Sequence, residues 1–152
     1  MVVWEVPALT PPHGALAIEA LQRLIALLNH TGRAGGMGLG GHDCGYGVQQ
    51  VHAWLCGLPL RTRLGPQGLD HDPLRYGTTG LLADANVDAL VWIASLSPEH
   101  GVPDTDVPRV VLGHPGLPVP AGDTVFIPVA TPGIGAAGQI ARGDGIVVLP
   151  LH

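Results

Sequence analysis

The sequence predicts an α/β protein with three layers, in which helices and long loops rich in proline and glycine flank a mostly parallel sheet. Three apolar runs favour this fold class, because they are continuous rather than alternating, which is typical of strands buried on both faces. An upstream segment has the apolar spacing of an amphipathic helix. The three runs span residues 89–94, 109–112 and 124–127.

The chain length predicts one domain. The 152 residues suffice for a single hydrophobic core and are too few for two full domains. We therefore treat residues 1–152 as one domain, with an irregular N-terminal arm over 1–13 that ends at two prolines, Pro11 and Pro12.

The first half of the chain predicts two helices. Residues 14–30 have apolar side chains at helical spacing, and Glu19 and Arg23 are placed for an ion pair four residues apart. A weak strand followed by a loop is expected over 32–45. A second helix is expected over 47–57, because Gly57 precedes Pro59 and is a typical helix end.

The second half predicts strands joined by connections that contain little helix. Residues 58–77 have neither a helix nor a strand period, so we expect a long surface or interface loop there. A short helix is expected over 78–85, leading to Asn86 and Asp88, and a fourth strand over 146–149. Prolines between the strands leave room only for loops or very short helices in the crossovers.

Composition excludes several classes of protein. Apolar residues form 46% of the chain, which excludes a disordered acidic protein. Charged residues form only 12%, about half the usual share, and lysine is absent, so we expect a partner to cover part of the surface. A net charge of -5 with scattered arginines argues against nucleic acid. With no signal peptide or membrane span expected, we predict a cytoplasmic protein with reduced cysteines.

Two stretches match the G-x-G-x-x-G pattern of dinucleotide-binding loops, Gly36 to Gly41 and Gly133 to Gly138. The first follows a helix, and Arg61 lies where an acidic ribose ligand belongs. The second follows a strand, but Gly143 and Gly145 interrupt the helix that should come next. Close packing of loops is the favoured explanation for both.

Residues able to carry chemistry form no complete site. His52 and Cys56 are one helical turn apart, yet two ligands on one helix do not make a zinc site. Ser95 lies at the carboxyl end of a buried strand, without a G-x-S-x-G elbow. Neither a metal site nor a catalytic triad is expected. The candidates weighed are His42, Asp43, Cys44, His52, Cys56, Ser95 and Ser97.

Four segments, in order, resemble the B subunit of formylmethanofuran dehydrogenase, a family within the molybdopterin and tungstopterin oxidoreductases. The last segment is the most specific, and it reads DTVFIPVATPGIGAAGQIARGDG. The resemblance is closest to the short form found in the bacterial formyltransferase/hydrolase complex. The segments are 17–29, 41–51 with the loop GHDCGYG, 87–95 and 123–145.

The resemblance implies a noncatalytic structural subunit whose partners are the other subunits of that complex. The complex converts formyl-tetrahydromethanopterin to formate through a formylated methanofuran-type carrier. By the resemblance, the carrier and a hydrolytic zinc belong to other subunits, and this chain holds no cofactor. Neither nucleic acid nor a membrane is implied as a partner.

Departures from the family bear on cofactor binding. Two cysteines cannot replace the four thiolate ligands of an iron-sulfur cluster, and Gly135 and Ala137 stand where the family usually carries acidic residues. Catalytic and metal-ligating residues are therefore not expected, and cofactor-binding residues stay unassigned. Two alternatives remain open: a truncated subunit that shares a molybdenum or tungsten pterin, and a module that binds the methanofuran tail.

Overall fold

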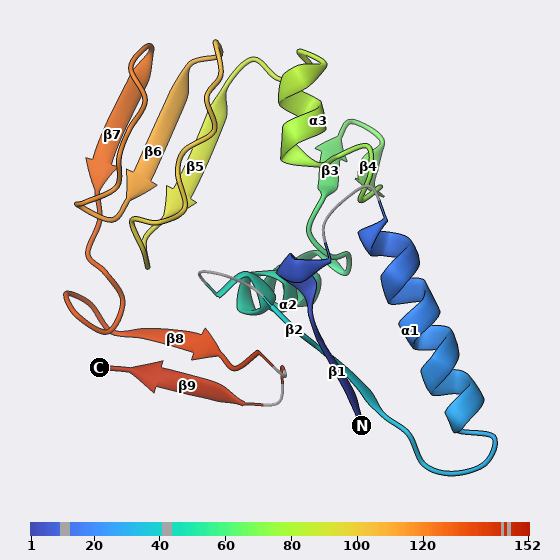
Figure 1. Ribbon diagram of the computed structural model, residues 1–152. Helices are drawn as coiled ribbons and strands as arrows, with labels where there is room; N and C mark the ends of the chain where they lie inside the picture. Colours follow the sequence, from blue (N-terminus) through green and yellow to red (C-terminus); the bar gives the residue numbers. More distant parts are fainter. Residues whose placement is uncertain (10–12, 41–43, 144, 146) are drawn as a thin grey trace.

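The computed structural model describes residues 1–9, 13–40, 44–143, 145 and 147–152. Helices and strands are mixed along the chain, and a three-stranded parallel sheet lies in the second half (Figure 1). The predicted α/β class is therefore confirmed. Among the described residues, no helix is both long enough and apolar enough to cross a membrane.

The N-terminal region forms a β-α-β unit. Strand β1 (Val2–Glu5) pairs in parallel with β2 (Gly36–Leu39), and α1 (Gly14–Leu28) connects them after a short 3-10 turn, η1 (Val6–Ala8). The predicted irregular arm over 1–13 is therefore wrong for its first residues, where β-branched and aromatic side chains favour a strand. A Cβ at Gly36 would collide with the δ-carbon of Ile25, so glycine lets α1 pack closely on β2.

The middle of the chain contains the second predicted helix and an unpredicted hairpin. Helix α2 (Gly45–Cys56) ends at Gly57, whose positive φ of 77° suits a residue without Cβ. Strands β3 (Thr62–Gly65) and β4 (Gly68–His71) pair antiparallel across a two-residue turn. The loop predicted over 58–77 is thus corrected to a hairpin, after which α3 (Thr78–Ala83) forms the short helix expected there.

The three apolar runs form one parallel sheet with strand order β5-β6-β7: β5 (Leu90–Ala94), β6 (Arg109–Gly113) and β7 (Thr124–Pro128). The main hydrophobic cluster lies on one face of this sheet, which we call the inner face. Side chains from both crossover loops join it there. The buried members are Ala94, Val102, Val111 and Leu117, with Trp92 and Phe126 packed against them.

Buried Arg109 ties this sheet to its crossover loops. Its Nε donates a hydrogen bond to the hydroxyl of Thr124 at 2.7 Å. Its Nη1 and Nη2 donate to the backbone oxygens of Pro103 at 2.9 Å and Ala121 at 2.8 Å. Since a buried polar group is costly unless paired, these contacts are what make an arginine tolerable in the core.

The chain ends in an antiparallel hairpin of β8 (Gly138–Ala141) and β9 (Val148–Leu151). The sequence predicted the last strand two residues early and did not predict β8. Helix α2 packs against β8, and Figure 1 shows this hairpin below the parallel sheet.

The arrangement differs from the expected layers in one respect. Within the described residues, the strands form four separate sheets, and the parallel sheet carries its core on one face only. The accessible surface is 10468 Å², whereas a compact monomer of this mass exposes about 7,300 Å². The fold is therefore open, and many large apolar side chains remain exposed.

Candidate functional site

A cavity of about 270 Å³ is lined by residues of α2 and of the β8–β9 hairpin, and its lining is mostly apolar. Cys44 lies at its edge, at the N-terminal boundary of α2, with a left-handed backbone (φ 60°). The thiol accepts a hydrogen bond from the backbone N–H of Ala141 at 3.4 Å. Within α2, Gln50 donates to the hydroxyl of Tyr46 at 2.9 Å. The Cys44 thiol therefore joins the start of α2 to the hairpin, while the other polar pair lies on the helix alone.

His52, Cys44 and Cys56 are the candidate metal ligands that lie within the described residues. His52 points its Nδ1 at the backbone oxygen of Leu58, 2.9 Å away, which fixes the segment after α2. Both Cys44 and Cys56 are free thiols and half-buried. His42 and Asp43 lie outside the described residues. Within the described part of the chain, no group of three or more His, Cys, Asp or Glu side chains is placed to hold a metal ion.

The candidate serines follow β5 directly. Ser95 is half-buried at the carboxyl end of the strand, as predicted. Ser97 stabilises a turn, because its hydroxyl accepts a hydrogen bond from the backbone N–H of Glu99 at 3.1 Å.

The two glycine-rich motifs lie in strand and turn structure. Gly36 and Gly38 belong to β2, so the first motif is not a strand-to-helix loop. In the second motif, a Cβ at Gly138 would be only 2.8 Å from the Cβ of Pro132, and one at Gly135 3.3 Å from that of Ala130. Close packing therefore explains the second motif, as expected.

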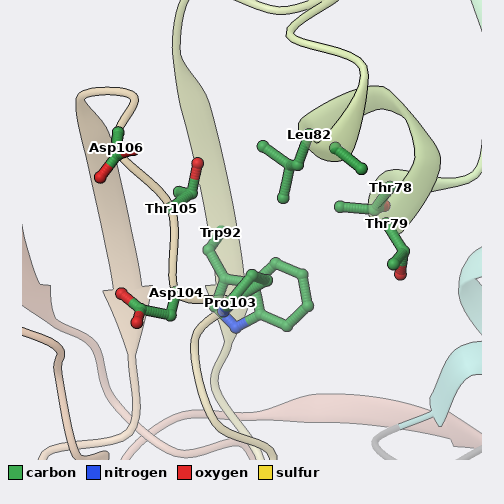
Figure 2. Close-up of a pocket in the computed structure, with 9 residues that line it drawn as sticks. Thr78, Thr79, Leu82, Trp92, Pro103, Asp104, Thr105 and Asp106 are labelled. Carbon is green, nitrogen blue, oxygen red and sulfur yellow. The ribbon is translucent and has the colours of Figure 1, made fainter.

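A larger cleft of about 470 Å³ lies between α3, β5 and the loop before β6. Figure 2 shows the indole of Trp92 below it, Thr78 and Leu82 on the α3 side, and Asp104 and Asp106 on the loop side. The indole N–H is buried and has no hydrogen-bond partner in the structure. The sequence analysis above did not predict this cleft; the two aspartates between Pro103 and Pro108 are the signal in the sequence that points to it.

A charged cluster joins the β3–β4 hairpin to the turn that precedes α3. Tyr76 is buried and donates a hydrogen bond to Asp70 at 2.5 Å, while the guanidinium of Arg63 lies 5.5 Å from its ring centre. The hydrogen bond to the Asp70 carboxylate, reinforced by burial, raises the pKa of Tyr76 above 10.0. Backbone N–H groups of Arg75 and Leu74 lower the pKa of Asp72 below 3.8. These contacts are structural in kind, since they hold a turn before α3.

No protein-family model matches the chain. The chain is 30% identical, over 129 residues and 84% of its length, to the B subunit of the formyltransferase/hydrolase complex Fhc from Methylorubrum extorquens. It also superposes with a TM-score of 0.74 and 27% identity on a chain of the crystal structure of that organism's complex FhcABCD with methylofuran, covering 91% of this chain.

The chain is a homologue of the Fhc B subunit. Agreement of sequence and fold over most of its length carries this assignment, and it confirms the resemblance seen in the four segments. The chain spans 36% of the length of the curated Fhc B subunit and 39% of the matching crystallised chain. Both relatives therefore contain a large portion that has no counterpart here.

Proposed function

We propose that this chain is a noncatalytic structural subunit of a formyltransferase/hydrolase complex. That complex would convert formyl-tetrahydromethanopterin to formate by way of a formylated methanofuran-type carrier. The single observation that carries the proposal is the homology to the Fhc B subunit over 84% of the chain.

The surface of the chain supports a role in assembly. It exposes about 3,000 Å² more than a compact monomer of the same mass, by the area scaling given above, and the exposed residues include more than twenty large apolar side chains. Surfaces of this kind usually mark contacts with other proteins. The partners would be the other subunits of the complex, and the complex would work in the cytoplasm.

The contacts of the candidate residues also support this role. Cys44 and His52 hold neighbouring segments through hydrogen bonds to the backbone, and Ser97 stabilises a turn. Formyl transfer and hydrolysis would then be carried out by other subunits, which would also hold the carrier and the hydrolytic zinc.

A second candidate function is binding of the carrier's tail. The matching crystal structure contains methylofuran, and this chain has two clefts large enough for part of an extended molecule. Titration of the assembled complex with methylofuran, comparing Gln50→Ala with the unmodified chain, tests this function. A weakening of at least tenfold would favour it over a purely structural role.

Purification of the tagged chain from its host tests the main proposal. We expect the other subunits of the complex to co-purify in fixed proportion, together with both activities. Elemental analysis belongs to the same experiment, because stoichiometric molybdenum or tungsten would instead support the truncated pterin subunit. Recovery of the chain without those subunits would contradict the proposal.

A further inference from the structure

The cavity lined by α2 and the β8–β9 hairpin is bounded at one end by a close contact. There the backbone N–H of Ala141 donates to the sulfur of Cys44 at 3.4 Å, and a Cβ at Gly47 would lie 3.2 Å from the Cβ of Ala141. Farther along α2, space of about 270 Å³ is left where closely packed side chains normally lie. Three apolar side chains of α2 line it and remain 46% to 71% exposed: Val48, Val51 and Trp54.

The lining suits an aromatic group. Trp54 and Tyr46 contribute aromatic rings, while Val51 of α2 and Val148 of β9 contribute aliphatic contacts from the two elements. Offset or edge contacts between aromatic rings add to the free energy gained by burying apolar area. Every described residue of the lining is uncharged. Because an ionised group is costly to bury without a partner, this lining favours an uncharged ligand.

One pair of polar side chains in the lining adds a hydrogen bond to the requirements. The Nε2 of Gln50 donates to the hydroxyl of Tyr46 at 2.9 Å, and both residues line the cavity. A tyrosine hydroxyl that accepts one hydrogen bond keeps its own proton to donate. A ligand with a carbonyl or ether oxygen could therefore accept a hydrogen bond from Tyr46.

The volume of the cavity limits the ligand to a small molecule. About 270 Å³ is near the lower end of the roughly 300–1,000 Å³ typical of ligand pockets, whereas an α-helix with its side chains is about 10–12 Å in diameter. We infer that this cavity binds an uncharged molecule of one or two aromatic rings that carries a hydrogen-bond acceptor. The inference goes beyond both candidate functions, because the ligand class follows from the lining alone.

Protection of Cys44 by a small aromatic probe tests this inference. The probe is prodan, an uncharged naphthalene that carries a carbonyl group. The tagged chain is purified from its host with the subunits that accompany it, and its thiols are alkylated with N-ethylmaleimide with and without saturating prodan. Peptide mass spectrometry follows each cysteine separately. Cys44 lines the cavity, whereas Cys56, at the other end of α2, does not. We expect prodan to slow alkylation of Cys44 at least fivefold and that of Cys56 less than twofold.

Matched variants of α2 locate the probe by a second measurement, the blue shift of prodan fluorescence on binding. Val51→Phe adds bulk to the lining, while Leu55→Phe adds a ring at a residue that is 79% exposed and lies outside the lining. We expect Val51→Phe to weaken prodan binding at least tenfold and Leu55→Phe to change it less than twofold. Tyr46→Phe removes the donor hydroxyl and should weaken binding at least threefold.

The alkylation experiment needs no substitution, so the inference can fail even where a variant does not fold. Equal slowing at both cysteines, or unchanged alkylation of Cys44, would overturn it. Equal binding of prodan by the Val51→Phe and Leu55→Phe chains would also overturn it. Co-purification of the other subunits tests the proposed function and enters neither measurement, so the two proposals can fail separately.

Discussion

At the residue scale, Arg109 makes the most demanding set of contacts. Its buried guanidinium donates hydrogen bonds to the hydroxyl of Thr124 and to one backbone oxygen in each of the two crossover loops. Lysine cannot make all three hydrogen bonds, because its ammonium is one compact charged group, whereas the guanidinium is planar and carries N–H donors on three nitrogens. We expect Arg109→Lys to lower the free energy of unfolding by about 2–4 kcal/mol, measured by urea unfolding at low protein concentration.

The matched control is Arg23→Lys. Arg23 forms a 2.6 Å ion pair with Glu19, and both side chains are exposed on α1. Exposed pairs of this kind contribute little, so this variant should change the unfolding free energy by less than about 0.5 kcal/mol. Equal effects at the two arginines would contradict the role assigned to Arg109.

Tyr76 gives a pH-dependent prediction. Because its folded-state pKa is raised, its contribution to stability is fully present below pH 10.0 and is lost as the pH rises through the folded-state value. Asp70→Asn removes the carboxylate and should move the pKa of Tyr76 back towards its usual value. Ultraviolet titration of tyrosinate, in a Tyr46→Phe background that leaves one tyrosine, measures this pKa. An unchanged titration would rule out the hydrogen bond as the cause.

At the element scale, the first turn of α2 distinguishes two glycines. A Cβ at Gly47 would lie 2.6 Å from the sulfur of Cys44 and 3.2 Å from the Cβ of Ala141, whereas one at Gly45 would have no neighbour within 4 Å. We expect Gly47→Ala to push α2 away from β8 and to destabilise the fold by about 1–3 kcal/mol.

Gly45→Ala is the control, and it should be neutral or slightly stabilising, because alanine favours helix. Thermal unfolding of both variants checks the prediction. If the two substitutions have the same effect, α2 and β8 are not packed as closely as described.

The helices and the parallel strands were predictable because their signals are local. Apolar spacing indicated α1, Gly57 and Pro59 indicated the end of α2, and three continuous apolar runs indicated the parallel sheet. The β3–β4 hairpin was not predictable in this way, since Pro66 and the flanking glycines dominate a short segment. Two more strands lacked a local signal. Strand β8 begins at a glycine, Gly138, and β1 depends on pairing with β2, which is distant in sequence.

The candidate site was less predictable than the fold. The position of Ser95 at a strand end followed from the sequence, but the partners of Cys44 and His52 are backbone atoms, which no residue pattern indicates. The apolar face of the parallel sheet opposite its core had a signal, because continuous apolar strands predict burial on both faces. Only the register of the three strands shows that its side chains form one surface.

At the scale of the whole molecule, the open fold predicts poor behaviour in isolation. The chain has few charges and many exposed apolar side chains, so at high concentration we expect self-association rather than a monodisperse monomer. Val91→Thr combined with Ile93→Thr should reduce this association. Size-exclusion chromatography with light scattering measures both. A soluble, monodisperse monomer of the unmodified chain at high concentration would contradict the dependence on partners.

The central claim is that this chain assembles the complex without performing its chemistry. The most direct test is turnover of formyl transfer and hydrolysis per assembled complex for Cys44→Ala, Cys56→Ser and Ser95→Ala. We predict turnover within a few-fold of the unmodified complex, with assembly quantified in the same samples. Loss of a nucleophile or general base costs on the order of 10² or more in rate. A variant that assembles fully yet loses at least that much would contradict the claim.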